Sequence, residues 1–178
     1  MTDEQSETDD PAGVPETVAT AAADRPAFER AGDGYRVTTT AFDARVTATP
    51  VGERAIGFAV TVEVPTLSSA VDGEVGSAVA EGWRDTFERR LAEAGTATRA
   101  RVDLKTFEVE SDGDTVTVVY GFEFSNAARG LDVAKTFVEY VEGTYVEGVV
   151  PGYDYLPPVS DLLAAASQGD GERGGTPL

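Results

Sequence analysis

The stretch AIGFAVTVEVP, residues 55–65, decides the fold of this chain. Its large apolar side chains stand at every second position, namely Ile56, Phe58, Val60, Val62 and Val64, and a proline ends the run. Strict alternation over this length predicts a β-strand whose apolar face lies against a core. A strand of this kind is typical of an antiparallel sheet that is covered on one face.

A hairpin is predicted downstream of this strand. Residues 101–110 and 115–124 flank the turn Ser111-Asp112-Gly113-Asp114, and Asp-Gly is a favoured turn sequence. The second strand of the hairpin alternates through Val116, Val118, Tyr120, Phe122 and Phe124. The turn also carries two carboxylates, but Ca²⁺ takes about six to eight oxygen ligands, so we expect no metal site there.

Residues 35–49, upstream of the first strand, are also rich in β-forming side chains. Their apolar positions are odd-numbered up to Thr39 and even-numbered from Phe42 onward. An alternation that changes phase indicates that one residue has been added to a strand. We therefore interpret the change near Thr40 and Ala41 as a β-bulge.

Two long amphipathic helices are predicted. Residues 74–95 place Val75, Val79, Trp83, Phe87, Leu91 and Ala94 on one stripe. Residues 128–149, which Ser125 or Asn126 can cap, carry apolar side chains over about half of the helical circumference, enough to contact two neighbours. Shorter helices are expected at 15–24 and 159–167.

The predicted fold class is α+β, a two-layer sandwich with an antiparallel sheet of about four strands and helices mainly on one face. The expected order is α-β-β-α-β-β-α-α, which is similar to small chaperone and sensor domains related to type III secretion chaperones. We expect an acidic disordered segment at 1–14, one domain over 15–167 with an extended connector at 153–158, and a disordered tail at 168–178.

The charge balance points to a high-salt environment. The chain has 32 Asp and Glu against 14 Lys and Arg, a formal net charge of −18. At molar salt the Debye length falls to about 3 Å, so that repulsion among these carboxylates is screened. We therefore expect a halophilic protein. The same charge argues against direct binding of nucleic acid, which depends on basic side chains that neutralise phosphates.

Composition also excludes several kinds of chemistry. The chain has no cysteine and no histidine, so disulfides, thiolate catalysis, zinc–thiolate sites and serine–histidine triads are impossible. No apolar run approaches the roughly 18 residues of a membrane span, and the acidic N-terminus lacks the pattern of a secretion signal. We expect a cytoplasmic protein with no membrane partner, no cofactor and no catalytic residue.

Four segments together resemble an uncharacterised family of haloarchaeal proteins, a domain of unknown function. They are DGYRVTTTAFDA (33–44), EVPTL (63–67), EGWRDTFERRL (81–91) and VEGTYVEGVVPGYDY (141–155). The resemblance covers roughly residues 30–165. It implies a halophilic source and brings no assigned site residues.

Five residues are candidates for binding. Arg90 falls within the apolar stripe of its helix, next to Trp83, where a guanidinium has to reach past the helix end or find a partner. Tyr145, Tyr153 and Tyr155 lie in a segment rich in glycine and proline, and aromatic side chains held on turns are common in recognition surfaces. Each set also has a structural explanation: a local ion pair for the arginine, and an arm folded back on the domain for the tyrosines.

Two functions remain open. The first is a non-catalytic protein-interaction module, adaptor or chaperone-like, which forms a homo-oligomer or binds another protein through Tyr145–Tyr155. The second is a small-molecule-binding protein or carboxylate-based enzyme with a pocket near Trp83 and Arg90. A deep pocket with convergent polar groups would favour the second.

Overall fold

The computed structural model describes residues 13–171, so the predicted disordered segments 1–14 and 168–178 lie largely outside the described residues. Residues 168–171, expected in the disordered tail, continue the last helix. The helices are α1 (Glu16–Ala23), α2 (Leu67–Ala70), α3 (Ser77–Leu91), α4 (Ala94–Ala97), α5 (Ala127–Glu147) and α6 (Val159–Gly171). The strands are β1 (Phe28–Ala31), β2 (Gly34–Val37), β3 (Asp43–Val51), β4 (Ala55–Pro65), β5 (Thr106–Asp112) and β6 (Thr115–Phe124).

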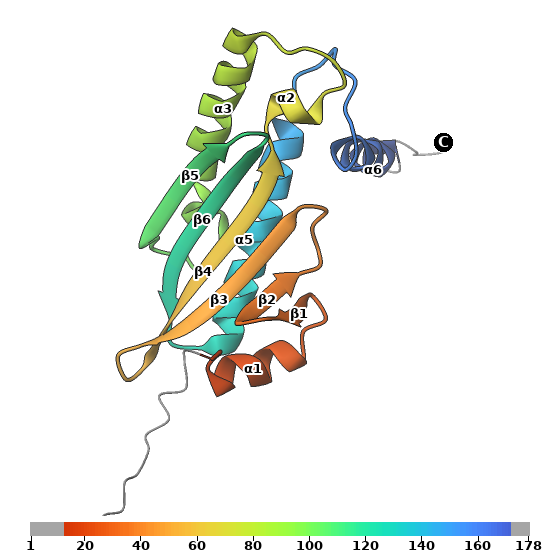
Figure 1. Cartoon of the computed structure of the whole chain (residues 1–178). Helices are drawn as coiled ribbons and strands as arrows, with labels where there is room; N and C mark the ends of the chain where they lie inside the picture. The colour runs from red at the N-terminus through yellow and green to blue at the C-terminus, as the bar shows by residue number, and fades with distance from the viewer. Residues whose placement is uncertain (1–12, 172–178) are drawn as a thin grey trace, which may run out of the picture.

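All six strands form one antiparallel sheet in the order β1-β2-β3-β4-β6-β5 (Figure 1). The α+β class and the antiparallel sheet predicted from the sequence are confirmed. The predicted number of about four strands is wrong, because the described residues contain six. β4, the strand of residues 55–65, lies inside the sheet and pairs along its whole length with β3 and β6.

The predicted single strand at 35–49 is in fact the hairpin of β2 and β3. Tyr35 pairs with Val46, and the chain turns between the two strands near Thr40. Both a bulge and a turn change the phase of an alternation, so the pattern alone does not distinguish them. Polar contacts with α5 hold the turn: the backbone N–H of Ala41 donates to Glu142 Oε2 at 2.8 Å, and the Thr40 hydroxyl donates to the same oxygen.

Strand β1 was not predicted. Its four residues include only one large apolar side chain, Phe28, which is buried and packs edge-on against Tyr35 at 6.3 Å. A strand this short has too few alternating positions to give a recognisable pattern.

Helix α5 crosses the inner face of the sheet, behind β4 and β6 in Figure 1. Gly130 lets it approach closely, because a Cβ at this position would lie 2.2 Å from the ring of Phe58 on β4. The helix also contacts α1 and α3, as its wide apolar face predicts. Asn126 caps it by accepting a hydrogen bond from the backbone N–H of Arg129 at 3.0 Å.

Helix α3 is shorter than predicted, beginning at Ser77 and ending at Leu91. Val79, expected on the apolar stripe, is 39% exposed. Two tyrosine hydroxyls donate to carbonyls of the last turn, where the helix itself supplies too few N–H partners. One of these carbonyls, that of Arg90, also accepts from the backbone N–H of Glu93 at 3.1 Å. Tyr120 donates to the carbonyl of Leu91 at 2.8 Å, and Tyr140 donates to that of Arg90 at 2.7 Å. The end of α3 is thus tied to both the sheet and α5.

Candidate functional site

Two of the candidate residues, Trp83 and Tyr145, belong to an aromatic cluster between α3 and α5. Trp83 stacks on Phe87 at 5.1 Å and meets Tyr145 edge-on at 5.4 Å. Phe42 closes the cluster at 5.1 Å from Tyr145. The Tyr145 hydroxyl donates to the carbonyl of Pro65 at 3.0 Å, and burial raises the pKa of this phenol well above its ordinary value. The position of both rings is that of core residues.

Arg90 lies beside this cluster and is exposed. Together with Trp83 it lines a hollow of about 240 Å³ between α3, the end of α5 and Val150. The indole N–H of Trp83 is buried without a hydrogen-bond partner among the described residues. Drug-sized ligands occupy pockets of about 300–1,000 Å³, so the hollow is small for that purpose.

The arm that carries Tyr153 and Tyr155 folds back onto the domain. The Tyr155 hydroxyl donates to the carbonyl of Val150 at 2.7 Å and accepts from its N–H at 2.9 Å. Val71 forms a β-bridge with Tyr155, and backbone hydrogen bonds of 2.8 Å flank it. Both tyrosines are half-buried. The structure thus brings Trp83, Arg90 and Tyr145 together, with Tyr155 reaching the same region through Val150.

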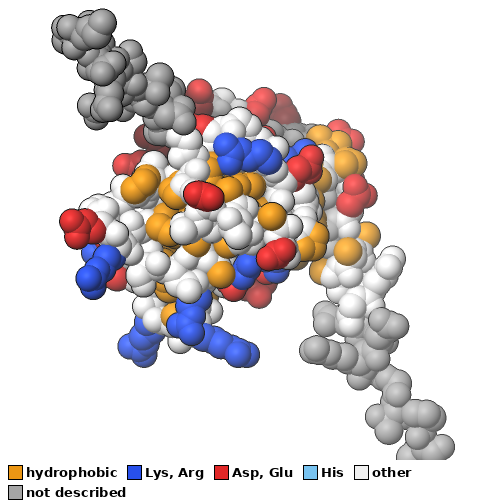
Figure 2. All heavy atoms as spheres, turned by 90° about the horizontal axis from the view of Figure 1, so that it is seen from below, with side chains coloured by type: hydrophobic (Ala, Val, Ile, Leu, Met, Phe, Trp, Pro, Cys, Tyr) orange, Lys and Arg blue, Asp and Glu red, His pale blue; other side chains and the backbone are white. Residues whose placement is uncertain are grey.

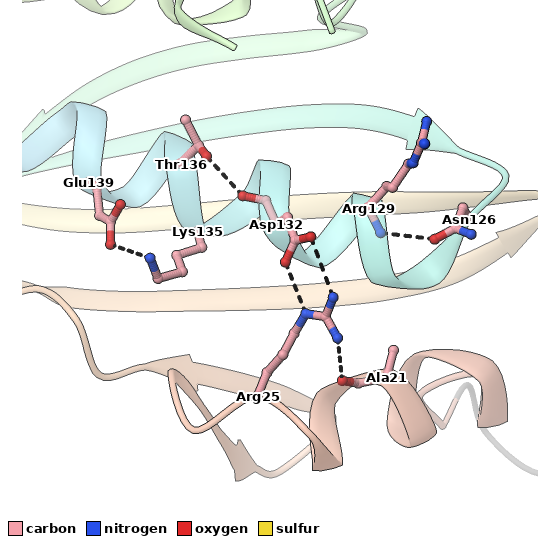
Figure 3. A network of polar contacts seen from close by, with 8 residues as sticks. All are labelled: Ala21, Arg25, Asn126, Arg129, Asp132, Lys135, Thr136 and Glu139. Carbon is pink, nitrogen blue, oxygen red and sulfur yellow. Dashed lines mark hydrogen bonds and ion pairs between the residues drawn. The ribbon is translucent and has the colours of Figure 1, made fainter. Parts of the chain in front are cut away.

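A polar network that the sequence did not reveal lies at the other end of α5 (Figure 3). Arg25, which follows α1, donates through Nε to Asp132 Oδ1 at 3.0 Å and through Nη2 to Oδ2 at 3.4 Å. Its Nη1 donates to the carbonyl of Ala21 at 3.0 Å. The hydrogen bond with Asp132 raises the pKa of the guanidinium further above its ordinary value. This pair ties α1 to α5.

Hollows lie on both sides of Asp132. One, of about 540 Å³, is lined by residues 24–28 with Thr38, Thr39 and Lys135. The other, of about 620 Å³, lies between α5 and residues 97–100 and is lined by Arg99 and Arg129. Figure 2 looks at this end of the molecule and shows apolar side chains gathered there, with Lys and Arg side chains at several places around them. In the sequence, this site is indicated only by Arg129, which lies three residues after the Asn126 cap.

The outer face of the sheet, turned toward the viewer in Figure 1, is crossed by none of the described helices. Seven outward side chains of β3, β4 and β6 are small and carry no charge: Thr47, Gly57, Ala59, Thr61, Thr117, Val119 and Gly121. The same strands also carry the exposed charged residues Asp43, Arg45, Glu63 and Glu123 on this face. Water-exposed faces of antiparallel sheets are usually polar. In the sequence, the small side chains of β4 and β6 occupy the alternate positions of these strands, between the large apolar ones.

No helix among residues 13–171 is long and apolar enough to cross a bilayer. Nor do acidic side chains of this part of the chain gather in a group of three or more that could hold a metal ion.

The fold and these surfaces define an α+β domain with a six-stranded antiparallel sheet that is open on one side. A model of a family of unknown function, DUF5813, matches residues 23–165, and the chain belongs to this family. This agrees with the resemblance to a domain of unknown function. Neither the curated proteins nor the solved structures give a match.

Proposed function

We propose that this protein is a non-catalytic protein-interaction module that acts through the outer face of its sheet, and that its partner there is a second copy of the chain. The observation that carries the proposal is a broad face that none of the described helices covers, with a block of small, uncharged side chains where β4 and β6 pair. The buried centres of protein interfaces are depleted in charged side chains.

The charges at the two sides of this face support a second copy as the partner. One cross-strand row runs from Arg36 on β2 through Arg45, Thr61 and Val119 to Glu108 on β5. Thr61 on β4 is its middle member. The row is therefore positive on one side of β4 and negative on the other.

A two-fold axis along β4 would match these charges. It places β2 of one copy opposite β5 of the other. The contact between Arg36 of one copy and Glu108 of the other therefore forms twice, once on each side of the axis. In a two-fold interface the same patch serves both partners. The neighbouring row, Thr47, Ala59, Gly121 and Thr106, would cross the axis at Ala59. Its small side chains suit the roughly 10 Å spacing of packed sheets.

The face is large enough for a stable interface. The five strands from β2 to β5 contain 4, 9, 11, 10 and 7 residues in their order across the sheet. At about 3.3 Å per residue and about 4.8 Å between strands they cover roughly 650 Å². Two such faces bury on the order of 1,200 Å², which is the lower end of the range for specific interfaces. Glu63 is exposed next to Thr61 and would lie near Glu63 of the second copy. These two carboxylates repel each other, so we expect the dimer to strengthen as salt screens the repulsion.

Light scattering during gel filtration at high KCl tests this function. We expect a mass twice the 18.7 kDa of one chain. Ala59→Arg puts a charge near the axis, where it would face the same arginine of the second copy. The repulsion between the two charges should give monomers. Ala165→Arg, the same change at an exposed position of α6, is the matched control and should remain a dimer. A monomeric wild-type protein, or a dimeric Ala59→Arg variant, contradicts the proposal.

The alternative function, a small-molecule-binding protein or carboxylate-based enzyme near Trp83 and Arg90, has weaker support. The hollow there is about 240 Å³, and the aromatic rings beside it pack against one another. The tyrosine-rich arm likewise makes contacts within its own domain.

The setting that we propose for this module is a cytoplasm of high salt, as in a haloarchaeal cell. The support is the net charge of −18 and the presence of only two lysines, Lys105 and Lys135, among 14 basic residues. Few lysines leave little aliphatic stem on the surface, and carboxylates hold water at high ionic strength.

A further inference from the structure

We propose that the hollow between α5 and residues 97–100 binds a small organic anion, a carboxylate or phosphate group carried on an apolar body. Its volume of about 620 Å³ lies within the range of small-molecule sites. The site lies on the helix side of the sheet and does not depend on the proposed sheet-to-sheet dimer.

Charge is the first argument for an anion. Arg99 and Arg129 both line the hollow, and neither forms an ion pair with a carboxylate among the described residues. An arginine fork is well suited to carboxylate and phosphate oxygens.

The acidic residue in the lining does not cancel this charge. Asp132 is engaged by Arg25, which lies 3.0 Å away. The pair is neutral as a unit, so the two lining arginines leave the hollow with a net positive charge.

The position of Arg129 is a second argument. It lies in the first turn of α5, which contains no acidic side chain. The positive end of a helix dipole disfavours a cation at this position. An anion bound beside Arg129 would offset that repulsion.

The rest of the lining defines the other part of the ligand. Phe124, Val133, Ala97 and Ala100 present apolar surface. The hydroxyls of Thr98 and Thr136 already donate to the carbonyls of Gly95 and Asp132. Recognition of charge is therefore left to the arginines, and the apolar surface suits a hydrocarbon or aromatic group attached to the anion.

Amide chemical shifts of the full-length protein test this site at one KCl concentration that keeps the chain folded. The probes are phenyl phosphate, inorganic phosphate and benzyl alcohol. We expect phenyl phosphate to cause saturable shifts in residues 97–100 and 124–136, with a Kd at least tenfold lower than that of either other probe. Saturation elsewhere, or equal affinity for benzyl alcohol, overturns the proposal.

Variants connect the binding to the two arginines. Arg99→Gln combined with Arg129→Gln should raise the Kd for phenyl phosphate at least tenfold while the thermal midpoint stays within a few degrees. Arg54→Gln, at an exposed turn position that is not part of the lining, should leave the Kd unchanged. A double variant that keeps the wild-type Kd overturns the assignment. The dimer mass measured on the same samples reports on the sheet face separately.

Discussion

At the scale of single residues, one glycine sets the distance between α5 and the sheet. A Cβ on Gly130 would meet the Phe58 ring at 2.2 Å, whereas a Cβ on Gly143 of the same helix would meet nothing within 4 Å. Gly130→Ala should therefore lower the free energy of unfolding by about 1–3 kcal/mol through overpacking. Gly143→Ala, the control, should raise it by roughly 0.5–1 kcal/mol through helix propensity. Chemical denaturation of both variants measures the difference, and equal effects would contradict the described packing.

Buried phenols give a second prediction at this scale. Burial raises the pKa of Tyr120 and Tyr145 in the folded state, while an unfolded tyrosine ionises near pH 10. Their contribution to stability is therefore complete below about pH 10 and is lost at higher pH, as ionisation favours the unfolded state. Urea melts at pH 8 and pH 11, followed by tyrosinate absorbance, should show this loss. Tyr145→Phe should lose less stability between pH 8 and pH 11 than the wild type does. A loss equal to that of the wild type would argue against burial of the Tyr145 phenol.

At the scale of elements, the sequence predicted those with a long and regular pattern. β4, β6 and α5 were located within a few residues because their apolar positions repeat many times. The segment 35–49 was misread because a tight hairpin and a bulge shift the alternation in the same way. The five candidate residues were chosen for type and spacing, but spacing does not reveal which aromatic rings pack together. The Arg25–Asp132 pair joins residues 107 positions apart, a distance at which local patterns carry no information.

The arm at 149–156 gives a prediction at the element scale. Tyr155 holds Val150 through two hydrogen bonds and bridges to Val71. Replacing Tyr153 and Tyr155 with Ser should lower the free energy of unfolding by about 1–3 kcal/mol, since half-buried rings and these bonds are lost. Thermal melts measure this, with Tyr153→Phe as a mild control. A double variant as stable as the wild type would instead favour an arm that is free to recognise a partner.

At the scale of the whole molecule, net charge governs stability. With a charge of −18 and few ion pairs among the described residues, folding brings carboxylates together at a cost that salt screens. We expect the thermal midpoint to rise steadily as KCl increases from about 0.1 M toward the molar range. Circular dichroism melts measure this, and a midpoint indifferent to KCl would contradict a halophilic origin.

The arrangement of charge across the sheet is the other property of the whole molecule. Arg36 and Glu108 lie at opposite ends of one row, with β4 between them. Within one chain they are separated by three strands, so they do not contact each other. In the proposed dimer, Arg36 of each copy faces Glu108 of the other copy. The two residues therefore form a pair only across the interface.

A charge exchange at these two positions tests the proposed function most directly. The measurement is the dimer dissociation constant, obtained by light scattering at the lowest KCl concentration at which the chain stays folded, because molar salt screens exposed charge pairs. Arg36→Glu and Glu108→Arg should each weaken the dimer, because each brings like charges together at both contacts. The chain that carries both substitutions should regain most of the wild-type affinity. If the double variant dissociates as readily as the single variants, or if no variant changes the mass, the outer face of the sheet is not the interface.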